Sequence, residues 1–126
     1  MTPAEFKCQR ETMGLSTKWL AERWKVSEYS VQRWERSRQL PQALETDFNA
    51  IVVEFSQRVK EAAEIGGESI IVPRTDREAP VEYPAQWYRA IAQRAHEETG
   101  IRILFYGDEY EPPEESASWS DGEKSD

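Results

Sequence analysis

Signals that start and stop helices follow one another so closely in residues 1–41 that only short helices can form there. Capping side chains and an early proline predict three of them: Pro3–Thr12 after Thr2, Thr17–Trp24 after Ser16, and Glu28–Ser37 after Ser27. Gly14 ends the first helix, and Leu40-Pro41 closes the segment. Helices this short are marginal alone in water, so the three must pack against one another.

Charge separates this segment from the rest of the chain. The net charge of the 126 residues is −8, but residues 1–41 carry eight Lys or Arg and five Glu, a net +3. The remaining residues carry eight Lys or Arg and 19 acids, a net −11. This asymmetry indicates a basic working surface on one part of the chain and an acidic remainder.

The pattern after residue 41 predicts a small α/β unit. A long helix over Gln42–Ile65 carries an amphipathic stripe made of Leu44, Phe48, Ile51, Val52, Phe55, Val59 and Ala62. A short strand (Ser69–Val72), a helix (Pro84–Thr99) and a second strand (Ile101–Tyr106) follow. The last segment, Gly107–Asp126, has eight acids and one Lys, which predicts a disordered tail.

These elements predict a mainly α chain in three parts. Residues 1–41 form a helix-turn-helix domain, residues 42–106 a small α/β dimerisation module, and residues 107–126 a disordered acidic tail. Nothing in the sequence predicts an enzyme, a metal site, a cofactor or a small-molecule ligand, and we expect Cys8 to be a small buried side chain. No apolar run is long enough for a membrane span, so we expect a cytoplasmic protein.

The third predicted helix presents one polar face to the outside. Because Val31 and Trp34 point inward, the opposite face consists of Glu28, Tyr29, Gln32 and Arg33, and it continues to Arg36. Arginine can bind both acceptors of guanine, glutamine can pair with adenine, and glutamate can accept from cytosine N4. Tyr29 fits a thymine methyl or a phosphate, whereas the Glu28 carboxylate is also repelled by phosphate. These four residues are the candidate base contacts.

A second set of side chains lies at helix starts or on the flanking loop. Contacts from such positions to DNA phosphates set the register of a protein without selecting a sequence. The candidate phosphate contacts are Thr17, Lys18, Ser30, Arg36 and Arg38.

The stretch from Phe6 to Pro41 resembles the Cro/C1-type (XRE-like) helix-turn-helix family of phage and bacterial repressors. The matching residues are Arg10-Glu11, Gly14-Leu15-Ser16, Leu20-Ala21, Val26-Ser27, Val31, Trp34-Glu35 and Leu40-Pro41. The resemblance implies operator binding through the third helix, with the same four base contacts, and a structural pairing of Arg10 with Glu35. The order of elements after residue 41 resembles, more weakly, the YdiL-like and anti-CRISPR-associated repressors.

Three residues depart from the pattern of that family. Lys25 stands where the turn usually has glycine, and a left-handed conformation there would cost about 1–2 kcal/mol. Gln9 replaces a residue that is usually apolar, and Trp19 replaces one that is usually polar. These departures concern the packing around the first helices rather than the fold.

We therefore expect a homodimeric, sequence-specific transcriptional repressor that binds a palindromic operator in double-stranded DNA. One recognition helix makes too few contacts for operator-level affinity, and the second module has little core without a partner. The expected dimer interface comprises Phe48, Ile51, Val52, Phe55, Val59, Ile70 and Ile103. The alternative is a protein-interaction module, an antitoxin-like partner whose acidic C-terminal half binds another protein.

Overall fold

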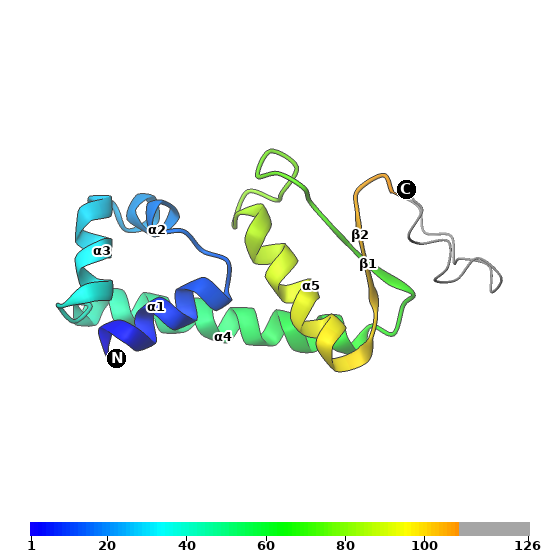
Figure 1. Cartoon of the computed structure of the whole chain (residues 1–126), viewed down its shortest axis with the longest axis horizontal. Coiled ribbons are helices and arrows are strands. Elements are labelled where there is room, and N and C mark those ends of the chain that lie inside the picture. Colours follow the sequence, from blue (N-terminus) through cyan, green and yellow to red (C-terminus); the bar gives the residue numbers. More distant parts are fainter. Residues whose placement is uncertain (109–126) are drawn as a thin grey trace, which may run out of the picture.

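Helices dominate the chain, whose computed structural model describes residues 1–108 (Figure 1). The elements are α1 (Pro3–Thr12), α2 (Thr17–Trp24), α3 (Glu28–Arg36), α4 (Gln42–Glu64), β1 (Ser69–Val72), α5 (Ala85–Thr99) and β2 (Arg102–Phe105). The prediction of a mainly helical chain with two short strands is confirmed, and every predicted boundary lies within one residue of the observed one. The predicted acidic tail falls, apart from Gly107 and Asp108, outside the described residues.

The predicted capping residues begin the three short helices. The Thr2 hydroxyl accepts from the Glu5 amide at 3.0 Å, and the Glu5 carboxylate accepts from the Thr2 amide at 2.8 Å. Ser16 accepts from the Trp19 amide at 2.9 Å, and Ser27 accepts from the Ser30 amide at 3.1 Å. Such caps stabilise a helix by about 1 kcal/mol each, so local sequence fixes where these helices start.

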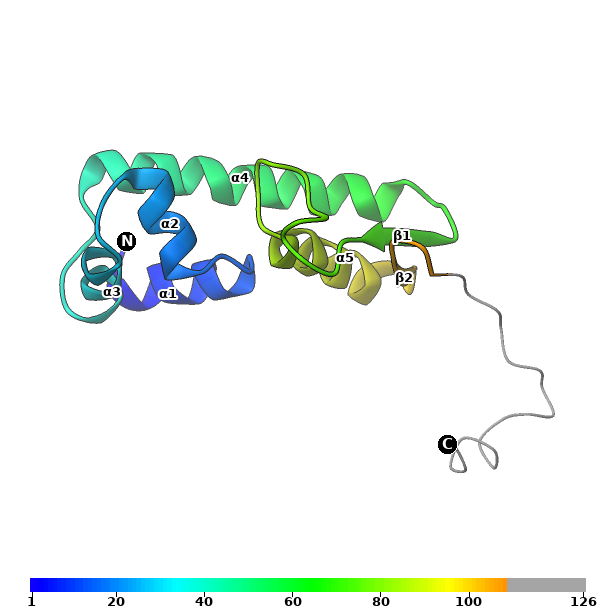
Figure 2. The same cartoon turned by 90° about the horizontal axis from the view of Figure 1, so that it is seen from above.

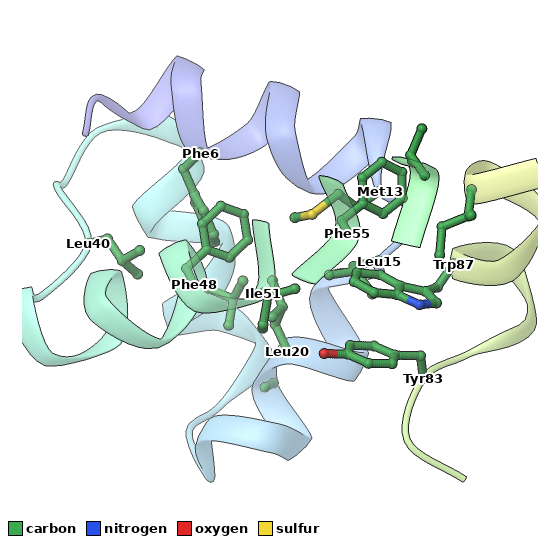
Figure 3. Packing of buried hydrophobic residues seen from close by; sticks show 14 residues of the cluster. Phe6, Met13, Leu15, Leu20, Leu40, Phe48, Ile51, Phe55, Tyr83 and Trp87 are labelled. Carbon is green, nitrogen blue, oxygen red and sulfur yellow. The ribbon is translucent and has the colours of Figure 1, made fainter. Parts of the chain in front are cut away.

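The long helix α4 supports both halves of the chain. Helices α1–α3 lie against its N-terminal half, α5 lies against its C-terminal half, and the two strands pack on α5 (Figures 1 and 2). Phe6 of α1 meets Phe48 of α4 with ring centroids 4.9 Å apart, and Phe55 of α4 meets Trp87 of α5 at 5.1 Å. These contacts belong to one continuous apolar cluster (Figure 3). The core therefore runs across the boundary that the sequence analysis puts after residue 41.

The chain itself covers most of the stripe that we expected at a dimer interface. Phe48, Ile51, Phe55 and Val59 are buried in the core, with at most 4% of each residue exposed. This part of the predicted interface is corrected, because the four side chains already pack inside one subunit. Val52 is half-buried.

The two strands pair with each other in parallel, and α5 forms the crossover that a parallel pair requires. Ile70 lies opposite Ile103 in the register, and both are half-buried. After β2, the Asp108 carboxylate accepts from Arg74 at 2.8 Å. Each strand thus pairs along one edge, and its other edge has no strand beside it among the described residues.

Cys8 is exposed, which corrects the expectation that it is buried. Cys8 lies two residues after Phe6, the side chain that α1 buries most deeply. Residues two positions apart on a helix face different sides of it. Across residues 1–108, no helix combines the length and apolar character that a membrane crossing requires.

The first prediction concerns Gly14, where the α1–α2 junction touches the start of α5. Its φ is +71°, and an added Cβ would lie 2.5 Å from the carbonyl oxygen of Gln86. We expect Gly14→Ala to lower the free energy of unfolding by about 2–4 kcal/mol, the sum of left-handed strain and a backbone clash. Urea denaturation of the full chain measures this loss.

Gly100→Ala is the matched control, because Gly100 has a similar φ of +76° but open space around its Cβ position. It should lose only the left-handed strain of about 1–2 kcal/mol. Equal losses in the two variants would show that the close approach between Gly14 and Gln86 is absent in solution.

Candidate nucleic-acid interface

A tight turn joins α2 to α3. Lys25 ends α2 in the left-handed conformation (φ 57°, ψ 45°), and its amide donates to the Ala21 carbonyl. Lys25 is the one non-glycine residue with positive φ among residues 1–108. Lys25 stands where the resembling family usually has glycine, and the strained left-handed conformation lies at this residue. The turn sets the angle between α2 and α3, so this strain is part of the candidate site.

The inner side of α3 is held by one buried side chain and one ion pair. Val31 is fully buried. Arg10 of α1 binds Glu35 through Nε and also through Nη2, the latter at 3.2 Å from Oε1. The Arg10 Nη1 donates to the Leu15 carbonyl at 2.7 Å. The expected pairing of Arg10 with Glu35 is therefore present, and it ties α3 to α1 and to the start of α2.

The outer side of α3 carries the four candidate base contacts. Glu28, Tyr29 and Gln32 are exposed, and Arg33 is half-buried. The guanidinium carbon of Arg33 lies 5.8 Å from the centroid of the Tyr29 ring, and that of Arg36 lies 6.0 Å from it. Tyr29 is 61% exposed, so its ring presents two guanidinium groups on an open surface. Interactions of this kind restrict the side chains of both arginines.

Glu28 connects the starts of α2 and α3. Its carboxylate accepts from the Thr17 hydroxyl at 2.7 Å. The single hydroxyl proton of Thr17, a candidate phosphate contact, is therefore engaged within the chain. The hydroxyl of Ser30, another candidate, lies 3.1 Å from the Ser27 hydroxyl beside the α3 cap. Both side chains shape the helix starts before any ligand is present.

The other candidate phosphate contacts surround the α3 face. Lys18, Arg36 and Arg38 are exposed, and none of them forms an ion pair with another described residue. Their charges are therefore available to a polyanion.

Arg23 of α2 is engaged differently from those three residues. Its Nε donates to the Asp47 carboxylate of α4 at 2.8 Å, and Trp24 Nε1 donates to the same carboxylate at 2.7 Å. The hydrogen bonds from Arg23 and then Trp24 hold the pKa of Asp47 below its usual value. Arg23 thus fixes α2 to α4 rather than adding to the free basic surface.

Sequence reasoning missed a stack of three rings beside α2. Tyr83, in the segment before α5, lies between Trp19 of α2 and Trp87 of α5. The signal available in the sequence was Trp19, a large aromatic residue where the resembling family has a polar one. Its partner could not be identified, because Tyr83 is distant in the chain and lies in a segment without regular structure.

The described part of the chain contains no group of three or more His, Cys, Asp or Glu side chains that could hold a metal ion. Comparisons with protein-family models, with curated proteins and with solved structures find no match to this chain. Its function therefore has to be inferred from its own residues.

The second prediction tests the strain at Lys25. We expect Lys25→Gly to raise the free energy of unfolding by about 0.5–1 kcal/mol, because it removes left-handed strain at some cost in unfolded-chain entropy. Lys25→Ala is the control, since it removes the charge and keeps the strain, and it should bring no gain. Chemical denaturation measures both variants. A glycine variant no more stable than the alanine variant would contradict the left-handed turn.

Proposed function

We propose that this chain is a sequence-specific DNA-binding transcriptional repressor, with α1–α3 acting as a helix-turn-helix domain. The observation that carries the proposal is the outer face of α3, where the half-buried Arg33 and the exposed Arg36 lie beside the exposed ring of Tyr29. The Arg10–Glu35 ion pair holds this helix from its inner side. The major groove of B-DNA admits one α-helix, and a helix presented in this way can enter it with its N-terminal residues foremost.

The side chains on this face match base edges in their chemistry. Arg33 can donate to both acceptors of a guanine, and stacking on Tyr29 lowers the entropy that it loses on binding. Gln32 is exposed and can pair with adenine. Glu28 can accept from cytosine N4 with the oxygen that does not bind Thr17. We therefore propose Arg33 as the principal base contact.

Positive charge around this face supports contacts with the DNA backbone. Lys18, Arg36 and Arg38 are exposed at the edges of the proposed groove-binding surface. Residues 1–41 carry a net charge of +3 within a chain of net charge −8, so the electrostatic attraction to DNA phosphates comes from this segment. Binding through such contacts releases counterions and weakens steeply as salt rises.

We propose that the protein acts as a homodimer on a palindromic operator. Two α3 helices related by a two-fold axis would read two half-sites, which one helix alone binds too weakly. Of the residues first expected at the interface, Val52, Ile70 and Ile103 keep part of their surface exposed. Ile71 is 46% exposed and, as the next residue of β1, faces the opposite side of the sheet from Ile70. A bound dimer represses by occupying its site.

The third prediction tests this function. Selection of duplexes from random DNA by the full chain should recover a palindromic sequence. Arg33→Ala should then bind the recovered duplex roughly 5- to 150-fold more weakly, because one bidentate contact to guanine is worth about 1–3 kcal/mol. Fluorescence anisotropy at fixed salt measures the affinities.

Arg94→Ala is the control, since Arg94 is an exposed arginine on α5, away from α3. The affinity of the Arg94→Ala variant for the duplex should equal that of the wild type. Recovery of no preferred sequence would contradict the proposal and favour the protein-interaction module. Full affinity in Arg33→Ala would show that another surface binds the DNA.

A further inference from the structure

Three stacked aromatic rings, which we call the aromatic brace, connect α2 to α5. The brace consists of Trp19, Tyr83 and Trp87. The rings of Trp19 and Tyr83 have centroids 5.5 Å apart and planes 25° apart, and those of Tyr83 and Trp87 lie 3.8 Å and 5° apart. Figure 3 shows the Tyr83 and Trp87 rings lying parallel, one over the other. The middle ring thus touches both halves of the chain.

Polar contacts from α4 hold the middle ring in place. The Tyr83 hydroxyl donates to the Glu54 carboxylate at 2.8 Å, and Arg58 donates to the same carboxylate at 2.8 Å. The Arg58 guanidinium also lies 5.8 Å from the centroid of the Tyr83 ring. Only 6% of Tyr83 is exposed. Burial and the hydrogen bond to Glu54 raise the pKa of Tyr83, so the phenol remains a donor at neutral pH.

The outer ring of the brace, Trp19, also has a cation beside it. The Arg23 guanidinium lies 5.7 Å from the Trp19 ring and is paired with Asp47 of α4. Next to the brace, the Gly14 junction approaches the backbone of Gln86 so closely that no Cβ fits between them. Helix α2 is therefore held against α4 and α5 together.

The three short helices also bury side chains of their own. Phe6, Leu20 and Val31 are fully buried, in the same apolar cluster as Tyr83 and Trp87. Trp87 is fully buried too, and its Nε1 has no hydrogen-bond partner among the described residues. Its ring is therefore placed for packing rather than for a polar contact. The brace fixes the angle between the helix pair α2–α3 and helix α5. Helix α4 alone would fix this angle less firmly, because long helices bend.

We infer that Tyr83 is a positioning residue that fixes the angle of the DNA-reading helix and so limits the half-site spacing that the dimer accepts. This inference rests on the proposed function. In a dimer joined through the α4–α5 half, the separation of the two α3 helices depends on the angle that the brace fixes. A firm brace selects one separation, and a loosened brace lets the two α3 helices reach sites at several separations.

The fourth prediction compares full-length wild type with Tyr83→Leu, which removes the middle ring, and Tyr83→Phe, which keeps the ring and loses the bond to Glu54. Trp19→Gln removes the half-buried ring at the other end of the stack. It provides a second test of the brace in case Tyr83→Leu fails to fold. Each protein is titrated with the recovered palindrome, with versions lengthened or shortened by one base pair between half-sites, and with a single half-site.

Wild type should bind the altered spacings at least about tenfold more weakly than the native spacing. In Tyr83→Leu and Trp19→Gln, the affinities for the native and altered spacings should differ by no more than about threefold. The affinity of these variants for a single half-site should stay within about twofold of wild type, because the α3 face is unchanged. Tyr83→Phe should keep most of the discrimination. Loss of single half-site affinity in a folded variant would show that the ring acts on the α3 face itself, which contradicts the inference.

The inference is overturned if the folded variants discriminate between spacings as strongly as wild type does. It is also overturned if their loss of discrimination comes with a loss of affinity for the single half-site, or if wild type binds every spacing equally well. These outcomes leave DNA binding by wild type intact. A wild type that binds neither the palindrome nor the single half-site overturns the proposed function as well, so the two failures are distinguishable.

Discussion

Burial of large side chains along α4 is the constraint on which the rest of the structure depends. Phe48 receives Phe6 and Trp24 from the short helices, and Phe55 receives Trp87 from α5. Aromatic side chains bury more area than any others, so a few such contacts can hold helices that are too short to be stable alone. Because these contacts satisfy the inner sides of α1–α3, the outer face of α3 is free to carry polar and basic groups. These polar and basic groups are the ones that we propose bind DNA.

Local signals allowed the helices and the polar face of α3 to be predicted. Thr2, Ser16 and Ser27 each cap the helix that follows, as expected from side-chain hydrogen bonds over three residues. Once Val31 was assigned to the core, helical periodicity determined which residues share the opposite face. The strained position, Lys25, was identified through the family resemblance, because the turn of that family usually has glycine there, and the structure has a positive φ at Lys25.

Contacts between distant residues could not be predicted in the same way. The stripe on α4 was correctly assigned as apolar, but periodicity does not say whether the same chain or a second subunit covers it, and here Phe48, Ile51, Phe55 and Val59 are covered by the chain itself. The stack of Trp19 on Tyr83 joins residues in different halves. The bond from Thr17 to Glu28 depends on the angle between two helices, which packing decides. Such pairings follow from tertiary structure alone.

The central claim is that the outer face of α3 binds DNA. Amide chemical-shift mapping of the full chain, titrated with a duplex recovered by selection, tests it most directly because each amide reports its own surroundings. We expect the largest chemical-shift changes at residues 27–38 and at the start of α2, near Thr17 and Lys18. Largest shifts on α5 and the two strands, with α3 unchanged under saturating duplex, would contradict it.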